Sequence, residues 1–286
     1  MPLIYREHSS GKPIFRLPPK TCDAHCHVFG PFDRYPMTGS RKYTPEEVPV
    51  DKLVRHHDDH GVERAVIVHP SIHGTDNRVT LDAIATDPKR FRGIASIDDS
   101  ISDRELERMQ GAGMRGIRFN FNKNLGGFPD LDLVKRSVQR VKALELPGWH
   151  LVMQIDGVDL PELDSLVRGL PIPFVIDHMG RMNSKKGTGQ PEFLGLLEWM
   201  KLEGAWVKLT CPERMSPWPY TEALPFARAL LEARPDRVLW GLDYPHPNIK
   251  APDNVDLINL VPKYTESDAE RQALLVDNAA RLYGFD

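Results

Sequence analysis

The feature that most constrains the fold is a series of eight short apolar runs spread along the 286-residue chain. Each run is a few residues long and is bounded by glycine, proline or charged residues, a pattern typical of buried strands. The clearest run is Ala-Val-Ile-Val at residues 65–68. The runs open near Thr21, Ala65, Phe91, Met114, His150, Phe174, Trp206 and Val238.

Segments with helical periodicity lie between these runs. Ser102 with Glu105, and Ser267 with Glu270, form capping boxes that predict helix starts. Another helix is predicted by an apolar stripe at helical spacing, which consists of Leu131, Val134, Val138 and Val141. A strand followed by a helix, repeated about eight times, predicts an α/β fold in which a parallel sheet closes into a (β/α)8 TIM-like barrel.

The main rival is an open, doubly wound sheet. No glycine-rich dinucleotide fingerprint follows the first run and no Walker-type phosphate loop occurs, which weakens the usual functions of that rival. The chain shows no internal repeat, low-complexity segment or interdomain linker. We therefore predict a single barrel domain over residues 21–286. The proline-rich residues 1–20 are expected to form an N-terminal arm that wraps the barrel, with disorder as the alternative.

Charge and composition exclude several classes of function. The chain has 37 Lys plus Arg against 40 Asp plus Glu, a net charge of −3, which argues against a nucleic-acid partner. No apolar stretch approaches the roughly 20 residues that span a bilayer, and the first residues lack the pattern of a secretory signal, so no membrane partner is expected. Three cysteines are too few for a disulfide framework. These features predict a cytoplasmic protein with a small-molecule partner.

Polar residues end most of the predicted strands, and in a barrel such strand ends converge on one mouth. His25 and His27 end the first run and share one face because strand side chains alternate, whereas Cys26 points away and is interpreted as a packing residue. The polar residues that end later runs are Arg118, Asn120, Gln154, Asp156, Asp177, His178, Arg181, Arg214, Asp243 and His246.

These residue types indicate acid–base chemistry on an acidic substrate. A His-x-His pair is weak evidence alone, but its place on the first strand strengthens it. Taken singly, each arginine at the mouth could equally be a structural ion-pair partner. Several together suggest a substrate with more than one acidic group, because guanidinium donors match carboxylates. Asp243, at the end of the last buried strand, is a candidate general base acting on water.

Two further groups of histidines precede and follow the second run, and a ligand role is not expected for the first group. One group between the first two strands predicts a solvated helix face, and it consists of His56, His57, Asp58, Asp59 and His60. His69 and His73 follow the second run, so a role for them at the mouth stays open.

Four motifs resemble the amidohydrolase superfamily, in its branch with 2-pyrone-4,6-dicarboxylate lactonase. They are Cys-Asp-Ala-His-Cys-His at 22–27, Asp-His-Met-Gly-Arg at 177–181, Gly-Leu-Asp-Tyr-Pro-His at 241–246 and Asn-Ala-Ala-Arg-Leu-Tyr-Gly at 278–284. The similarity runs from about Thr21 to the C-terminus. It is specific because the first three motifs fall on the first, sixth and eighth strands, in the family's order.

The resemblance implies a hydrolase that opens a carboxylated lactone. Asp243 would take a proton from the water that attacks the lactone carbonyl, so the rate is expected to rise with pH as Asp243 loses its own proton. His25, His27 and His178 would polarise that carbonyl and stabilise the oxyanion, work that metals do elsewhere in the superfamily.

The resemblance also implies a set of substrate contacts. Tyr43, Ser71 and Arg214 stand where the lactonase holds one substrate carboxylate, and Arg118 matches one of two arginines near the lactone's own carboxylate. Arg181 and His246 are predicted contacts from their places after the sixth and eighth runs, and the predicted set also includes Lys123, Asn124 and Gln154.

Two positions depart from the lactonase pattern. Asn124 stands where the lactonase has its second arginine, and Gln154 stands where it has a tyrosine. Both changes fall on the same half of the substrate. The sequence therefore predicts a related acidic lactone, or the same lactone held differently by Lys123.

The sequence favours catalysis without a metal. The middle strands lack the additional ligands of a binuclear site, and positive Arg118 disfavours a second cation. A single Zn²⁺ on His25, His27 and Asp243, with His178 as a further ligand, is the alternative. The alternative function is a metal-dependent decarboxylase or hydratase acting on an aromatic or unsaturated acid, and a non-catalytic binder of acidic metabolites is a third possibility.

Overall fold

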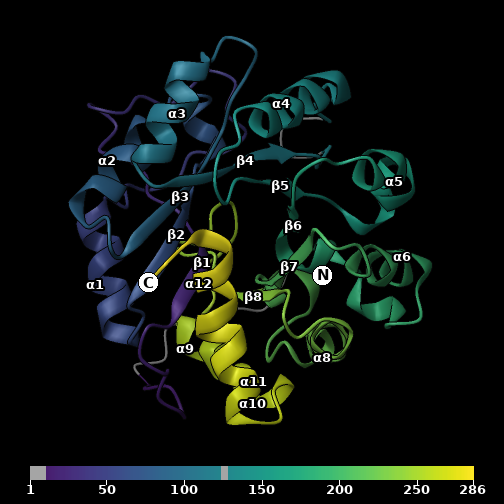
Figure 1. The fold of residues 1–286 in the computed structure, drawn as a ribbon. Coiled ribbons are helices and arrows are strands. Elements are labelled where there is room, and N and C mark those ends of the chain that lie inside the picture. Colours follow the sequence, from purple (N-terminus) through teal and green to yellow (C-terminus); the bar gives the residue numbers. More distant parts are fainter. Residues whose placement is uncertain (1–10, 124–127) are drawn as a thin grey trace.

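A sheet of eight parallel strands forms the centre of the molecule, in the order β1-β2-β3-β4-β5-β6-β7-β8 (Figure 1). The computed structural model describes residues 11–123 and 128–286. Each strand begins within one residue of the predicted opening of its apolar run. The strands are β1 (Cys22–Cys26), β2 (Arg64–Val68), β3 (Phe91–Ala95), β4 (Met114–Asn120), β5 (His150–Gln154), β6 (Phe174–Ile176), β7 (Ala205–Leu209) and β8 (Val238–Trp240).

The ring closes where the residues after β8 meet the end of β1. The backbone N–H of Asp243 donates to the carbonyl of His25 at 2.8 Å, and the N–H of His27 donates to the carbonyl of Tyr244 at 2.8 Å. These bonds continue the parallel pairing of the sheet from the last strand to the first. The predicted (β/α)8 barrel is confirmed.

Helices surround the strands in Figure 1. The α-helices are α1 (Val50–His60), α2 (Arg78–Thr86), α3 (Asp103–Gly111), α4 (Leu131–Ala143), α5 (Leu160–Arg168), α6 (Pro191–Met200), α7 (Pro212–Met215), α8 (Leu224–Ala233), α9 (Asn254–Ile258), α10 (Val261–Tyr264), α11 (Asp268–Gln272) and α12 (Asn278–Tyr283). A π-helical segment, Ala273–Asp277, joins α11 to α12. Single 3-10 turns are η1 (Ser71–His73), η2 (Gly157–Asp159), η3 (Asp177–Arg181), η4 (Ser184–Lys186) and η5 (Thr221–Ala223).

The predicted helix signals are confirmed. The Ser102 side chain accepts a hydrogen bond from the backbone N–H of Glu105 at the start of α3, and Ser267 does the same for Glu270 at the start of α11. These caps satisfy N–H groups that have no partner within the helix. The predicted stripe of α4 faces the core through Val134, Val138 and Val141, all of them buried.

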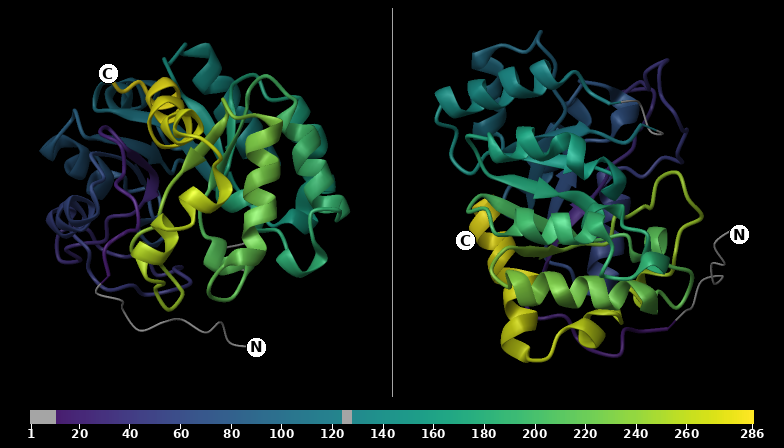
Figure 2. Two further views of the ribbon diagram at one scale, coloured as in Figure 1. Left: turned by 90° about the horizontal axis from the view of Figure 1, so that it is seen from below. Right: turned by 90° about the vertical axis from the view of Figure 1, so that its right-hand side faces the viewer.

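Two apolar layers hold the barrel together. The inner layer is built from alternate residues of the strands, among them Val66, Val152 and Leu239, and α12 closes it at one end with Leu282 and Tyr283. The right-hand view of Figure 2 shows α12 at one end of the strands and the yellow-green loop after β8 at the other. The outer layer joins the opposite faces of the strands to the helices. This arrangement leaves only the carboxyl ends of the strands for a polar site.

An irregularity in β1 decides which of its side chains enter the barrel. The register with β2 shifts between Asp23 and Cys26. Cys22 and Ala24 belong to the inner layer, whereas Cys26 belongs to the outer layer and its Sγ lies 3.5 Å from the carbonyl of Val66. The packing role predicted for Cys26 is confirmed.

The described part of the N-terminal segment lies against the barrel. The N–H of Ile14 donates to Oδ1 of Asn259 at 2.7 Å, and Leu17 is buried in the outer layer. The division into an arm and a barrel domain stays a prediction. Within residues 11–123 and 128–286, no helix is long and apolar enough to cross a membrane.

Candidate active site

A polar pocket opens at the carboxyl ends of the strands. It brings together side chains from β4 and β5 and from the segments that follow β1, β2, β6, β7 and β8. The residues that line it are His27, Tyr43, Pro70, Ser71, Arg118, Asn120, Gln154, His178, Arg214, Asp243, Pro247 and Asn248. The pocket thus gathers most of the site residues predicted from the sequence, although they are up to 216 positions apart in the chain.

Asp243 is held on both of its carboxylate oxygens. Oδ1 lies 3.2 Å from Nε2 of His27 and 3.5 Å from Nε2 of His25. Oδ2 accepts from Sγ of Cys211 at 3.0 Å and from Nη2 of Arg214 at 3.4 Å. Burial would raise the pKa of Asp243, but the hydrogen bond with His27 and the charge of Arg214 outweigh it and hold that pKa well below its usual range. Asp243 is therefore a carboxylate that can accept a proton.

The contact between His27 and Asp243 joins a ring nitrogen to a carboxylate oxygen. Nδ1 of His27 is 2.8 Å from the carbonyl of Val68, which can only accept, so Nδ1 carries a hydrogen. Nε2 of the same ring faces Oδ1 of Asp243 at 3.2 Å. An unprotonated ring nitrogen and a carboxylate oxygen are both acceptors and would repel, so this contact requires a shared proton.

His25 and His178 complete a group of three imidazoles. Their ring centroids are 4.6 Å apart, and Nδ1 of His178 lies 2.7 Å from Oγ1 of Thr210. Burial lowers the pKa of His25 to about 4 and that of His178 well below its usual range. Both rings are therefore neutral at neutral pH. Nε2 of His25 is buried, faces Asp243 and has no hydrogen-bond partner among the described residues.

Strained backbone places several of these side chains. His178, Cys211 and Asp243 follow β6, β7 and β8 and have φ of 55°, 57° and 66°. L-residues rarely adopt this left-handed region, and each instance costs roughly 1–3 kcal/mol. Three neighbouring strands thus end in the same strained conformation beside one pocket, a pattern that is typical of active sites.

The rest of the pocket offers donors to acidic groups. The hydroxyls of Tyr43 and Ser71 form a hydrogen bond, and burial raises the pKa of Tyr43 to about 12, so its phenol keeps its proton. Arg118 donates from Nε to Oδ2 of Asp177 at 2.9 Å and from Nη2 to Oε1 of Gln154 at 2.7 Å. Together with Arg214, these groups match a substrate that carries two anionic groups.

Two predicted contacts do not line the pocket. Nζ of Lys123 pairs with Asp159 at 2.9 Å and with Glu162 at 3.2 Å. Nε of Arg181 pairs with Asp156 at 2.7 Å. Carboxylates on the η2 and α5 segment and after β5 thus engage both cations outside the pocket lining.

His246 also lies outside the pocket lining. Its Nε2 is 2.9 Å from Oδ1 of Asn254, and its Nδ1 is 3.7 Å from Oε1 of buried Glu213. Burial would lower the pKa of His246, but the neighbouring Glu213 raises it. Asn124, the remaining predicted contact, lies outside the described residues.

The prediction of a solvated histidine face on α1 is wrong. His57 is fully buried, and its Nε2 lies 3.1 Å from Oδ2 of Asp23. His56 stacks on Tyr244 with ring centroids 3.8 Å apart and planes 8° apart. The charged neighbours Asp58 and Asp59 are exposed, so the helix is amphipathic with the histidines on its inner side.

His69 and His73 do not reach the pocket lining. Nδ1 of His69 is 3.0 Å from Oγ1 of Thr80, and its Nε2 is 3.2 Å from the carbonyl of Gly74. Nδ1 of His73 is 3.2 Å from the carbonyl of Pro36. Both rings thus hold the segment after β2 in place.

Sequence reasoning missed two residues that adjoin Asp243 and His25. Cys211 donates to Asp243, and Lys208 lies fully buried beside His25. A signal for Lys208 was available: it is the one charged residue in the run Ala-Trp-Val-Lys-Leu, on the same face as Trp206 of the inner layer. The left-handed turn that brings Cys211 to Asp243 had no comparable signal.

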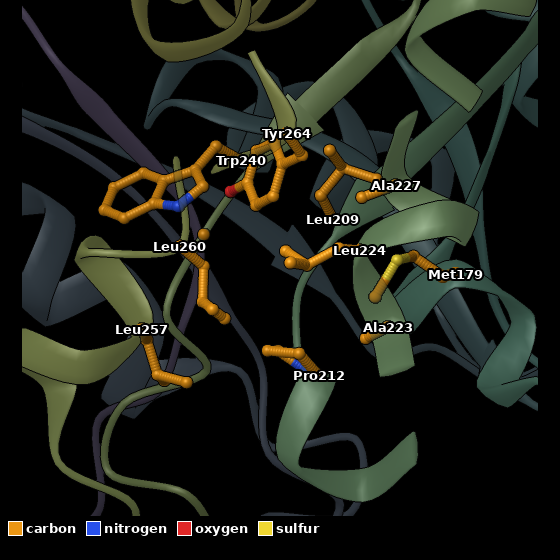
Figure 3. Close-up of a pocket in the computed structure, with 11 residues that line it drawn as sticks. Met179, Leu209, Pro212, Ala223, Leu224, Ala227, Trp240, Leu257, Leu260 and Tyr264 are labelled. Carbon is orange, nitrogen blue, oxygen red and sulfur yellow. The ribbon is translucent and has the colours of Figure 1, made fainter. Parts of the chain in front are cut away.

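A second cavity, between β7, β8, α8 and α10, is apolar. Figure 3 shows Leu209, Leu224 and Trp240 pointing into it. Its volume of about 20 Å³ admits roughly one water molecule. Its lining holds no charged side chain, so it offers no group that could bind an acidic substrate.

Known proteins resemble this chain over nearly its whole length. A family model described as Amidohydrolase matches residues 22–285. A 2-pyrone-4,6-dicarboxylate hydrolase from Comamonas testosteroni is 42% identical over 285 residues, which cover 95% of this chain and 92% of that protein. A 4-sulfomuconolactone hydrolase from Hydrogenophaga intermedia is 39% identical over 277 residues, which cover 94% of this chain and 90% of that protein.

A solved structure agrees with the barrel. It comes from Acinetobacter baumannii, bears a provisional 2-pyrone-4,6-dicarboxylic acid hydrolase name and contains bound citric acid. It matches with a TM-score of 0.81 and 25% identity over 93% of this chain and 100% of that one. Because the family model spans the barrel and a relative is 42% identical along it, this chain belongs to the amidohydrolase family.

Proposed function

We propose that this protein hydrolyses a lactone that carries two acidic groups, of the class that includes 2-pyrone-4,6-dicarboxylate and 4-sulfomuconolactone. The observation that carries the proposal is the ionised Asp243, which lines a pocket together with His27, His178 and two arginines. His25 does not line this pocket, but its buried ring lies behind it, with Nε2 3.5 Å from Oδ1 of Asp243. The names of the two relatives support a lactone substrate. The free, buried cysteines support the predicted cytoplasmic location.

Asp243 activates the attacking water in this proposal. The water oxygen forms a bond to the lactone carbonyl carbon while the carboxylate takes its proton. His27 supplies the shared proton as a hydrogen bond to the carbonyl oxygen, where negative charge develops. The bond to the ring oxygen then breaks, and that oxygen receives the proton held by Asp243. The product is an open-chain acid with one hydroxyl or its keto form.

The acidic groups of the substrate orient the ring. Arg214 with Tyr43 and Ser71 holds one anion, and Arg118 holds the other. Gln154 accepts from Arg118, so a substrate anion would replace that amide oxygen. This exchange of a neutral acceptor for a charged one favours the bound substrate.

The candidate metal ligands fit zinc by type. One nitrogen each of His25 and His178 and one oxygen of Asp243 lie within 4.8 Å of one another. However, Nζ of Lys208 lies 3.2 Å from Nδ1 of His25, and Nη2 of Arg214 lies 3.4 Å from Oδ2 of Asp243. Both cations would repel a divalent ion at this place. The residues therefore fit a metal poorly, and we propose metal-free hydrolysis.

The test replaces Asp243 by asparagine. Asp243→Asn keeps the shape but removes the base, so we expect kcat on 2-pyrone-4,6-dicarboxylate or 4-sulfomuconolactone to fall at least about 10²-fold with the circular dichroism spectrum unchanged. Asp99→Asn on the surface is the matched control. Full activity in Asp243→Asn, or hydrolysis of neutral lactones as fast as of diacids, would contradict the proposal. If chelation abolishes the activity and Zn²⁺ restores it, the proposal of metal-free hydrolysis is wrong and a metal-dependent hydrolysis takes its place.

A further inference from the structure

A buried ammonium group lies beneath the pocket and has no role in the chemistry described above. Lys208 belongs to β7, and its side chain is completely buried. Its Nζ lies 3.1 Å from Oδ1 of Asp177 and 3.2 Å from Nδ1 of His25. Burying a lysine is expensive unless its charge is paired, and here Asp177 supplies the pair.

Lys208, Asp177 and His25 form a triangle of polar atoms. Nδ1 of His25 also lies 3.2 Å from Oδ1 of Asp177, so each of the three atoms is near the other two. Oδ2 of Asp177 accepts from Arg118 at 2.9 Å. Burial opposes charge on Asp177, but the two cations outweigh it and hold the pKa of Asp177 well below its usual range. The carboxylate thus stays ionised.

The hydrogens of this triangle can be arranged in two ways. If Nδ1 of His25 carries a hydrogen, it donates to Asp177, and the ammonium then faces an N–H group and has Asp177 as its acceptor. If Nδ1 is bare, the ammonium donates both to Asp177 and to the ring. The second arrangement leaves bare Nδ1 and Oδ1 of Asp177 as two acceptors 3.2 Å apart, but the ammonium donates to both of them. It also satisfies one more donor of the buried cation and places the ring hydrogen on Nε2, 3.5 Å from the carboxylate of Asp243, so it is favoured.

We propose that Lys208 is a positioning residue that holds His25 in the tautomer with its hydrogen on Nε2. Nε2 has no hydrogen-bond partner among the described residues and lies 3.5 Å from Oδ1 of Asp243. The ring thereby presents a free donor beside the catalytic carboxylate, where the lactone carbonyl oxygen would lie. Asp177 alone would select the opposite tautomer. The tautomer of His25 does not depend on the proposed function. Only the identification of the group that the Nε2 hydrogen contacts, the lactone carbonyl oxygen, rests on it.

The first measurement needs no substrate. Protein labelled with ¹⁵N-histidine distinguishes a protonated from a bare ring nitrogen by NMR, and His25→Gln identifies the His25 signals. We expect Nε2 protonated and Nδ1 bare in the unmodified protein at neutral pH. A hydrogen found on Nδ1 overturns the proposal, whatever the activity of the protein.

The second measurement changes Lys208. Lys208→Met keeps the length and removes the donors, so Asp177 should draw the hydrogen to Nδ1. We expect kcat to fall about 10²-fold, as for loss of one oxyanion donor, with KM within about threefold. Lys201→Met, an exposed position, is the control and should change neither value. A variant that keeps kcat, or keeps the hydrogen on Nε2, contradicts the proposal.

A double variant separates tautomer control from simple structural support. In Lys208→Met with Asp177→Asn, the new amide can accept from Arg118 and donate to Nδ1 of His25. We expect the hydrogen to return to Nε2 and kcat to recover at least about tenfold relative to Lys208→Met alone. If Lys208 only supported the structure, kcat of the double variant would be no higher than that of Lys208→Met. Failure of the Asp243→Asn test would remove the proposed function but leave the NMR result standing.

Discussion

At the scale of single residues, charge on Asp243 depends on its partners. Sequence reasoning expects the rate to rise with pH as Asp243 loses its proton. The pKa of Asp243 lies well below its usual range. The rise in rate with increasing pH should therefore occur at pH values below the ordinary aspartate pKa of about 3.9. From about pH 5 upward, ionisation of this carboxylate should no longer change the rate.

Arg214 offers a test of this electrostatic control. Its guanidinium lies 3.4 Å from Asp243 and favours the ionised form. Arg214→Met should therefore move the acid limb of kcat to higher pH, and it should raise KM for a diacid lactone at least about tenfold through the lost anion contact. The pH profile of the steady-state constants measures both effects, with exposed Arg104→Met as the control. An acid limb that does not move would show that Arg214 leaves the base unaffected.

At the scale of elements, the seam between β8 and β1 sets the positions of Asp243 and His25. Gly241 follows β8, and a Cβ built on it would lie 2.8 Å from Oδ1 of Asp23 and 2.8 Å from the backbone nitrogen of His25. Asp23 in turn accepts from the N–H groups of His25 and Leu242. The seam therefore has room for glycine alone at this place.

Gly241→Ala should disrupt this seam. Because one contact is with backbone, it cannot be relieved by a side-chain rotation, and we expect a loss of about 1–3 kcal/mol in unfolding free energy. Activity should fall more than tenfold, since His25 and Asp243 sit on the two sides of the seam. Gly39→Ala is the control, as nothing lies within 4 Å of its Cβ. Urea denaturation measures the change in unfolding free energy, and steady-state kinetics measure the change in kcat. If Gly241→Ala matches Gly39→Ala in both quantities, the seam accommodates the added methyl group and the prediction is wrong.

At the scale of the whole molecule, buried neutral histidines tie stability to pH. Burial lowers the pKa of His25 and His150 to about 4 and that of His69 to about 3, whereas the unfolded chain protonates at its ordinary value. The unfolded state therefore binds more protons as the pH falls below about 6.5, and unfolding becomes more favourable. His246, whose pKa is raised, acts in the opposite direction and offsets part of this effect.

The unfolding free energy should accordingly fall from about pH 6.5 down to about pH 4, by on the order of 3 kcal/mol for each fully buried histidine. Urea denaturation at a series of pH values measures the slope. His150→Gln should reduce this slope by about one proton, because the variant removes one buried histidine that takes up a proton on unfolding. The substitution should leave the pocket intact, since His150 lies at the opposite end of β5 from the pocket residue Gln154. Stability that is constant between pH 7 and pH 5 would contradict this account.

Local chemistry decided much of what could be predicted from the sequence. The strand runs, the two capping boxes and the stripe of α4 follow from hydrophobic periodicity and capping, which act between residues close in the chain. Parallel barrel topology then brings all strand ends to one mouth, so His27, His178 and Asp243 could be placed together without coordinates. Family motifs supplied Tyr43 and Ser71, for which the surrounding sequence holds no structural signal.

The tertiary structure decided how each polar group is paired. Lys123 and Arg181 pair with carboxylates that are 36 and 25 positions away in the chain. His57 turns inward onto Asp23, which is 34 positions away. Only the fold decides which carboxylate comes closest to each of these groups. Lys208 faces His25 across the barrel from a strand 183 positions away. Periodicity tells which face of a strand is buried, but the distance between two such faces is a property of the closed barrel. The sequence by itself therefore determined the barrel and its reactive mouth, and only the packed structure determined the hydrogen bonds that set the charge of each group there.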